Sequence, residues 1–254
     1  MLLRRISEHV RTQNWTAVAL DFVIVVMGVF MGIQLGNWND ARVFAASEKS
    51  YLAELKSEIR RNNDVVRARV AMMERVVEAG RSGHAFLTSG APCSDDCWML
   101  TVDMFHASQV MFAPASRTVY DQLQRLDLPR SDAIKEAMSG YYGLDASIAE
   151  SFEDRPMFRE YVRKAIPEAV QQSLWNVCHE MIGAAERLIV DCAKRADDEM
   201  TRPALETLRA NPDVAAELNY WLGMHGLWIP VFKTMVVRGE ETIAAIDAEL
   251  GGGR

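Results

Sequence analysis

The strongest feature of the hydrophobic pattern is an almost unbroken apolar stretch near the amino end, residues 16–36, with the sequence TAVALDFVIVVMGVFMGIQLG. As an α-helix rising 1.5 Å per residue, it extends for about 31 Å, which matches the hydrocarbon thickness of a bilayer. Trp15 and Trp38 flank it, and indole rings favour the membrane–water interface. The pattern predicts a transmembrane helix over residues 15–38, with Trp15 and Trp38 as interface anchors.

Positive charge is unevenly distributed around this span, because Arg4, Arg5 and Arg11 all precede it. The positive-inside rule then assigns residues 1–14 to a cytoplasmic tail and residues 39–254 to the outside, which for a bacterial inner membrane is the periplasm. A cleaved signal peptide is the alternative. The apolar run is longer than a usual signal core and no clean small-x-small cleavage site follows it, so we expect an uncleaved signal anchor.

Within the span, a carboxylate and three glycines share one side of the predicted helix. Seven helical residues turn about 700°, so Asp21 lies within about 20° of Gly28. Glycines let two helix backbones approach closely in lipid, and a carboxylate there is less costly when it faces a partner. Glycine is also frequent in membrane helices, so the spacing can arise by chance. The position of Asp21 favours a helix-packing stripe made of Asp21, Val25, Gly28, Gly32 and Gly36.

Two longer motifs resemble a bacterial family of single-pass membrane proteins that is known only as a domain of unknown function. The first is D-x3-VVMGVFMGIQLGNWND followed by SYLAELKSEI (residues 50–59). The second, SRTVYDQLQRLDLPRSDAIKEAMSGYY (residues 116–142), is similar to a Tyr-x-x-Leu element followed by a helix that ends in a tyrosine pair. Leu126-Asp127 replaces the Ser-Gly that the family often has. The resemblance implies the anchored topology and no activity.

After the span, apolar residues recur every seven positions over residues 47–79, which predicts a long helix. One seam holds Leu52, Ile59, Val66 and Met73, and the alternate seam holds Leu55, Asn62, Arg69 and Val76. The two polar seam positions favour a helix of a bundle over an uninterrupted dimeric coiled coil. No strong breaker separates this helix from the span, and Gly80, Gly83 and the TSGAP loop predict its end.

Capping residues and prolines predict further helices at residues 98–105, 116–126 with Ser116 as N-cap, 131–151, 168–188, from 201, and 212–250. Pro230 is expected to kink or split the last one. No stretch alternates apolar and polar residues as a strand does, so no strand is expected. The predicted fold class is all-α: a single N-terminal transmembrane helix followed by a periplasmic helical bundle, whose first and last long helices pair antiparallel.

The four cysteines, Cys93, Cys97, Cys178 and Cys192, all follow the span and would meet an oxidising periplasm. An even number predicts two disulfides with three possible pairings. We favour Cys93–Cys97 and Cys178–Cys192, because loop closure is easier over short separations. Crossed pairings would join the loop to the later helix and are the alternative. A zinc or redox site with nearby histidines is disfavoured by the Cys-x3-Cys spacing.

The rest of the sequence gives only weak signals of binding, catalysis or cofactors. The net charge of −7 disfavours non-specific binding to nucleic acid. No zincin, nucleophile-elbow or P-loop motif occurs. His225 lies between Trp221 and Trp228, a setting more typical of a core or contact than of a haem or quinone site. We predict no catalytic residue, metal ligand or cofactor. The basic stretch over residues 155–164 is either a solvated face or a docking face for an acidic partner or anionic headgroups.

These observations support two functional hypotheses. In the first, the protein is a non-enzymatic accessory or interaction subunit. Its transmembrane helix packs on a membrane partner, either another copy or a larger respiratory, photosynthetic or transport complex, and its helical domain braces that partner on the periplasmic side. In the alternative, it is a periplasmic sensor or ligand-binding protein. Because the cytoplasmic tail is too short to fold as an output domain, its signal would pass through a partner helix.

Overall fold

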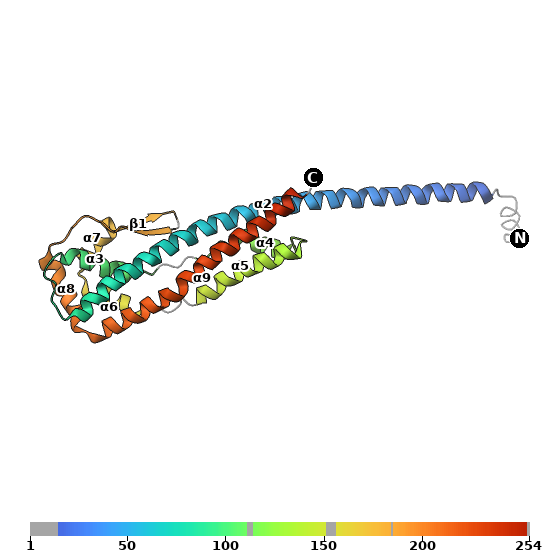
Figure 1. The fold of residues 1–254 in the computed structure, drawn as a ribbon. Helices are drawn as coiled ribbons and strands as arrows, with labels where there is room; N and C mark the ends of the chain where they lie inside the picture. The colour runs from blue at the N-terminus through green and yellow to red at the C-terminus, as the bar shows by residue number, and fades with distance from the viewer. Residues whose placement is uncertain (1–14, 111–113, 151–155, 184, 253–254) are drawn as a thin grey trace, which may run out of the picture. The chain divides into compact units, whose positions relative to one another are not determined.

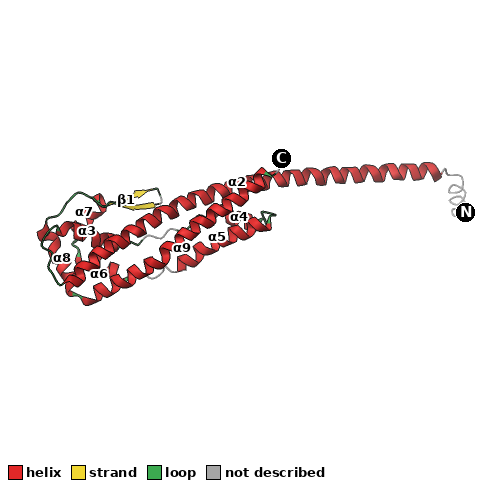
Figure 2. Ribbon diagram, in the orientation of Figure 1, coloured by secondary structure: helices red, strands yellow, loops and turns green. Residues whose placement is uncertain are grey.

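The computed structural model describes residues 15–110, 114–150, 156–183 and 185–252. Within these ranges the chain is mostly helical, with one two-stranded hairpin (Figures 1 and 2). The helices are α2 (Trp15–Ser89), α3 (Cys97–Ala107), α4 (Thr118–Arg125), α5 (Asp132–Glu150), α6 (Met157–Ala165), α7 (Glu168–Val177), α8 (Asp198–Ala210) and α9 (Pro212–Gly251), and the strands are β1 (His179–Ile182) and β2 (Ala185–Leu188). The all-α expectation is confirmed in its main part.

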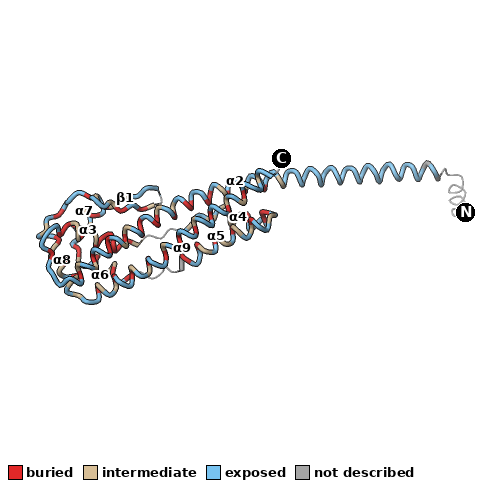
Figure 3. Tube along the Cα trace, viewed as in Figure 1, coloured by how far each residue is buried: buried red, intermediate tan, exposed pale blue. Residues whose placement is uncertain are grey.

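The chain divides into two compact units, residues 1–51 and residues 52–254. The described part of the first unit is the amino-terminal portion of α2, and its side chains are almost all exposed (Figure 3). The second unit holds the rest of α2 and every other element. The expectation that the span helix continues into the first long helix is confirmed, since α2 runs without a break from Trp15 to Ser89.

In the second unit, α2 and α9 run antiparallel, as the sequence predicts (Figure 1). Ion pairs along their length establish the direction. Lys56 pairs with Asp247, Arg67 Nη2 lies 2.6 Å from Glu240 Oε1, and Glu74 Oε1 lies 2.7 Å from Lys233 Nζ. Residue numbers rise along α2 while those of their partners on α9 fall. Each pair is solvent-accessible, so these contacts contribute little to stability.

Apolar burial holds the two long helices together. All eight predicted seam positions of α2 are buried: Leu52, Leu55, Ile59, Asn62, Val66, Arg69, Met73 and Val76. On α9 the buried residues follow an alternating four-three spacing, which is the same heptad seam: Val214, Leu218, Trp221, His225, Trp228, Phe232, Met235, Gly239, Thr242 and Ile246. Helix α5 packs along α9, and α3, α6 and α8 pack together toward one end of the pair (Figure 1).

Helix α2 does not end at Gly80, which corrects the sequence-based prediction. Gly80 and Gly83 are buried, and the helix continues to Ser89. A Cβ atom at Gly80 would lie 2.5 Å from Leu222 Cδ2, and one at Gly83 would lie 3.1 Å from Met104 Sδ. These glycines therefore serve close packing. A glycine inside a helix costs only about 1 kcal/mol, which such packing can offset.

The predicted helix over residues 168–188 is also wrong in its second half, as is the expectation of no strands. Helix α7 ends at Val177 and is followed by the antiparallel hairpin, in which His179 pairs with Leu188 and Ile182 with Ala185. Gly183 adopts a positive φ of 63° in the turn. Such a backbone conformation favours glycine and reverses the chain. The hairpin brings Cys178 and Cys192 together, which a continuous helix could not do.

Other boundaries shift for identifiable reasons. Ser116 is not the N-cap of α4, because that helix begins at Thr118 and the Ser116 hydroxyl bonds to Glu58. Helix α8 begins at Asp198, before the predicted start at Thr201. Helix α9 is not split by Pro230. That proline is exposed, so its ring lies on the solvent side of the helix and away from the packed seam.

Gly239 provides a test of the seam. A Cβ atom there would lie 2.4 Å from Oδ1 of Asn63, whose amide is held by Tyr141 and by the carbonyl of Val236. Gly239→Ala is expected to lower the free energy of unfolding of this unit by about 1–3 kcal/mol, as overpacking does. Denaturant titrations would measure the change. Gly226→Ala on the same helix, where a Cβ meets nothing within 4 Å, is the matched control and should be neutral or stabilising. Equal behaviour of the two variants would contradict this packing.

Candidate functional site

One helix in the described part of the chain is long and apolar enough to cross a membrane. It is the amino-terminal portion of α2, with a mean hydropathy of 2.3 over its best 18-residue window, and none of that window is buried. Large apolar side chains such as Leu20, Phe22 and Phe30 are 59–68% exposed. A helix buried in a soluble core has the same composition but is covered by protein. This one is not covered by the described residues.

The predicted stripe lies open along this helix. Asp21, Val25, Gly28, Gly32 and Gly36 are all exposed, and a Cβ atom built on any of the three glycines meets no neighbour within 4 Å. The described chain therefore leaves a flat strip of backbone uncovered on that side. Nothing in the structure tests whether another helix packs there.

The predicted interface anchors are only partly described. Trp38 is 64% exposed, and the guanidinium of Arg42 lies 6.0 Å from the centre of its ring. The side chain of Trp15 and the predicted cytoplasmic tail, residues 1–14, lie outside the described residues. The anchoring role of the two tryptophans stays a prediction.

In the second unit, the most elaborate arrangement of polar groups surrounds Glu58 on α2. Its side chain is buried, with only 1% of the residue exposed. The hydroxyl of Tyr142 donates to Oε1 at 2.8 Å, and the hydroxyl of Ser116 donates to Oε2 at 3.1 Å. A buried carboxylate is costly unless it is hydrogen-bonded, and these two hydroxyls begin to meet that requirement.

Glu58 also caps helix α4 from outside that helix. The backbone N–H groups of Val119 and Tyr120 donate to its carboxylate at 3.0 and 3.3 Å. The residue at the N-cap of α4, Arg117, makes no side-chain capping bond. First-turn N–H groups have no partner inside their own helix, and a negative charge near them is favourable. The carboxylate of one helix thus completes the start of another.

Two neighbouring asparagines on α2 extend the network. Asn62 and Ser116 are bonded reciprocally, since the Asn62 amide donates to the Ser116 carbonyl and accepts from its N–H, both at 2.9 Å. Asn63 donates to the carbonyl of Val236 on α9 at 3.1 Å and accepts from the Tyr141 hydroxyl at 3.2 Å. The polar residues of α2 therefore connect it to the segment before α4, to α5 and to α9.

Aromatic rings and a guanidinium cover this network. Tyr120 and Tyr142 stack with their ring centres 4.3 Å apart, and the guanidinium of Arg117 lies 4.9 Å from the centre of the Tyr120 ring. Burial, followed by the hydrogen bond to Glu58, raises the pKa of Tyr142 well above its ordinary value. The phenol stays protonated and remains a hydrogen-bond donor.

The network joins the two motifs that carried the family resemblance. Glu58 belongs to SYLAELKSEI, while Ser116, Tyr120 and Tyr142 belong to the second motif. Glu58 was not among the predicted site residues. The one signal for it was a charged residue directly before a predicted seam position, Ile59.

The predicted cysteine pairing is confirmed. Cys93 and Cys97 lie with their Cα atoms 5.9 Å apart, and Cys178 and Cys192 lie 5.0 Å apart, both bonded as disulfides. The first pair closes a loop that is held on α8, where Glu206 accepts from the Cys93 N–H at 3.2 Å. The second pair encloses the hairpin at its base.

Two buried histidines, His106 and His225, serve the fold. Nε2 of His106 donates to the carbonyl of Cys178 at 2.9 Å, and Nδ1 of His225 donates to the carbonyl of Trp221 at 3.0 Å. Burial lowers the pKa of each imidazole to about 4. His225 also contacts Trp228, with ring centres 5.6 Å apart, in the buried cluster that the core interpretation expected.

In the basic stretch over residues 155–164, Arg159 and Arg163 are turned inward, Lys164 is exposed, and Arg155 lies outside the described residues. Arg159 donates to the carbonyl of Ser108 at 2.7 Å. The guanidinium of Arg163 lies 4.2 Å from the ring centre of Phe105 and 4.9 Å from that of Trp175. Both cations therefore face the interior. Across the described ranges, no group of three or more His, Cys, Asp or Glu residues could hold a metal ion.

No family model, no curated protein and no solved structure matches this chain. The resemblance of its two motifs to a family of unknown function therefore stays a sequence-based prediction. The arrangement around Glu58 can hold helices in register, because each of its acceptors already receives donors from the protein. The groups of the open stripe on α2 are not engaged by any of the described residues.

Replacing Glu58 with glutamine tests the network. The amide keeps the size of the side chain, but its NH2 group would face donors and its oxygen carries no charge. Hydrogen bonds to charged groups contribute about 1.5–3 kcal/mol, so Glu58→Gln should lower the free energy of unfolding by about that amount. Glu54→Gln, on the exposed side of the same helix, is the control and should stay within about 0.5 kcal/mol. A neutral Glu58→Gln would show that the network contributes no stability.

The buried histidines predict a pH dependence. Their pKa is lower in the folded state than the ordinary 6.5, so the unfolded chain binds more protons and stability falls as pH drops from about 6.5 toward 4. In urea titrations, His225→Gln should reduce this pH-dependent loss of unfolding free energy by on the order of 2–3 kcal/mol. His106→Gln should have a similar effect. Burial raises the pKa of Asp103 and Asp145, which gives the opposite slope. Asp103 and Asp145 are present in the wild type and in the variants alike. A variant whose free energy of unfolding falls with pH as steeply as that of the wild type would therefore contradict the prediction.

Proposed function

We propose that this protein is a membrane-anchored, non-enzymatic interaction subunit of the bacterial inner membrane. In this proposal residues 15–38 cross the bilayer once, residues 1–14 lie in the cytoplasm, and the domain after the span lies in the periplasm. The observation that carries it is the apolar portion of α2, which exposes Asp21, Gly28 and Gly32 on one side, where none of the described residues covers them. A helix with this surface is best solvated by lipid together with another helix.

The physical argument rests on what each group requires. Exposed apolar side chains over about 31 Å of helix are satisfied by a hydrocarbon layer. Asp21 is not, because a carboxylate within the bilayer costs roughly 2.5–3.5 kcal/mol unless it reaches water or a polar partner. Glycines on the same side let a partner backbone approach closely. One neighbouring helix placed on this stripe would meet both requirements.

Other features support the assignment of the second unit to an oxidising compartment. Both cysteine pairs are disulfide-bonded, and disulfides persist in the periplasm while the cytoplasm keeps thiols reduced. The rigid helical unit, whose network connects α2 to its neighbours, is suited to bracing a partner. That partner is either a second copy or a larger respiratory, photosynthetic or transport complex.

The alternative is a periplasmic sensor or ligand-binding protein that acts through a partner helix. A cavity beside α2 in the second unit favours it, since a ligand bound there would contact the helix that also forms the proposed span. Both functions need the same partner helix at the stripe. They differ in whether occupancy of the second unit changes that contact.

Cross-linking in native membranes, followed by mild-detergent purification, tests the proposal. The wild-type chain should be recovered with a second copy or a larger partner. Gly28→Leu and Gly32→Leu should reduce that recovery about 5- to 30-fold, which corresponds to the roughly 1–2 kcal/mol of a close helix contact. Co-expression of two differently tagged copies separates self-association from a foreign partner.

Val26→Leu is the matched control, because position 26 lies roughly 160° around the helix from Gly28. It adds bulk to the same helix without changing the stripe, so its recovery should equal that of the wild type. A wild-type chain that remains monomeric, or that is recovered equally with either glycine variant, would refute the proposed contact.

A further inference from the structure

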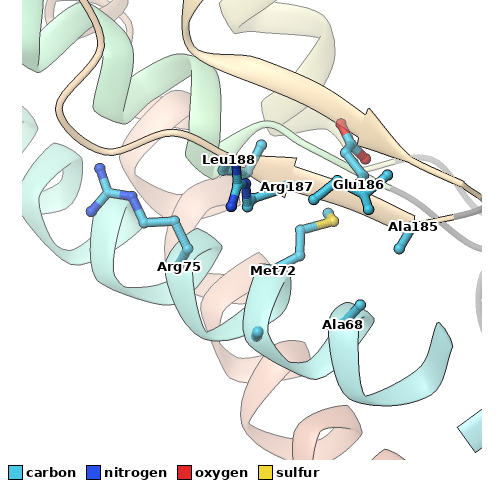
Figure 4. Close-up of a pocket in the computed structure, with 9 residues that line it drawn as sticks. Ala68, Met72, Arg75, Ala185, Glu186, Arg187 and Leu188 are labelled. Carbon is cyan, nitrogen blue, oxygen red and sulfur yellow. The ribbon is translucent and has the colours of Figure 1, made fainter. Parts of the chain in front are cut away.

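A cavity of about 370 Å³ lies in the second unit between α2 and the hairpin, away from the Glu58 network (Figure 4). Its α2 wall is formed by Ala68, Ala71 and Met72, and its hairpin wall includes residues 185–188. Alternate residues of a strand point to opposite faces, so four consecutive lining residues mean that β2 turns its edge toward α2. The cavity is therefore a slot between a helix and a strand edge.

The small side chains along both walls create this space. Ala68 and Ala71 on α2 and Ala185 on β2 end at Cβ, whereas a longer aliphatic residue at any of these positions would fill part of the slot. The volume falls within the range of small-molecule sites in proteins. An exposed pair of apolar residues, Met181 and Ile182, at 57% and 55% exposure, lies at the hairpin tip and continues the apolar surface to solvent.

The wall formed by the hairpin is fixed in place. A two-stranded hairpin is only marginally stable alone. Here the disulfide between Cys178 and Cys192 closes its base, and His179 Nε2 lies 2.6 Å from Glu186 Oε1 across the strands. The buried side chain of Leu188 anchors the end of β2. The cavity is thus held open by covalent and polar constraints, and does not depend on a ligand to form.

The charged residues on its rim determine the class of ligand. Arg75 is engaged with Asp103 at 2.7 Å and with Glu78 at 3.2 Å. The carboxylate of Glu186 is paired with His179, and Arg187 is paired with Glu180 across the hairpin. Each charged lining side chain therefore already has a charged or polar partner within the protein. A charged ligand would lose its hydration and gain no counter-charge, which is unfavourable.

We propose that this cavity is a binding site for a small, uncharged, apolar molecule. Its walls supply apolar contacts from α2 and the hairpin, and its matched rim charges select against ions. Burial of such a ligand would be driven by the apolar area removed from water. The proposal goes beyond the membrane role and does not depend on it, because every residue that lines the cavity belongs to the second unit.

Photolabelling of the full-length protein in detergent with (trifluoromethyl)phenyldiazirine tests the site. This uncharged probe loses dinitrogen on illumination, and the carbene inserts into nearby C–H bonds. Mass spectrometry should find label on the α2 peptide around Ala71 and on the hairpin, well above that on the α9 peptide carrying Leu227, which is exposed but not beside the cavity. Probe dissolved in the detergent micelle should also label the apolar part of α2, and that label serves as an internal reference.

Ala71→Leu should lower the label on the hairpin about tenfold, equivalent to about 1.4 kcal/mol of binding. Ala216→Leu is the matched control, since Ala216 is also an exposed helical alanine but does not line the cavity. Ala68→Leu provides a second filled variant should the first fail to fold. Equal hairpin labelling in the wild-type and filled proteins, or none above the Leu227 peptide, would overturn the proposal. Either result leaves the cross-linking test of the stripe unaffected.

Discussion

The antiparallel seam between α2 and α9 is the interaction on which the second unit depends. Both helices bury the same four-three spacing of residues, and most of these are apolar. Two α2 positions in the seam, Asn62 and Arg69, are polar, and buried polar groups cost free energy unless they are bonded. Asn62 finds its partners in Ser116, ahead of α4. The polar requirements of the long helices thereby determine where the shorter elements attach.

Glu58 shows this dependence most clearly. Its carboxylate accepts hydrogen bonds from first-turn N–H groups of α4 and from the hydroxyl of Tyr142 on α5. Neither short helix has to supply these contacts itself, and α4 lacks its own cap. A single residue on α2 therefore fixes both α4 and α5, while Asn63 fixes α2 against α9. Specific polar contacts of this kind set the register that apolar packing alone leaves degenerate.

The apolar run and the heptad spacing in the sequence were enough to predict the long apolar helix, the seam and the antiparallel pairing of the long helices. They failed at Gly80 and at residues 178–188, where the outcome depends on distant partners. Gly80 is needed because Leu222 of α9 packs against it and leaves no room for a side chain. The disulfide between Cys178 and Cys192 stabilises a hairpin whose strands are too short to show alternation. Glu58 could not be identified either, since its donors lie about 60–84 residues away along the chain.

Several charged and titratable groups of the second unit are already bonded within the protein. The imidazoles with lowered pKa, His106 and His225, donate to backbone carbonyls. In the basic stretch, Arg163 faces an aromatic ring and Arg159 donates to a carbonyl. Groups committed in this way hold the fold together and are poorly placed to exchange protons with a substrate. Uncovered apolar side chains remain along the amino-terminal part of α2 and in the slot beside the hairpin. At both places a partner would be selected by how closely it packs, and on α2 the carboxylate of Asp21 adds the requirement of a polar contact.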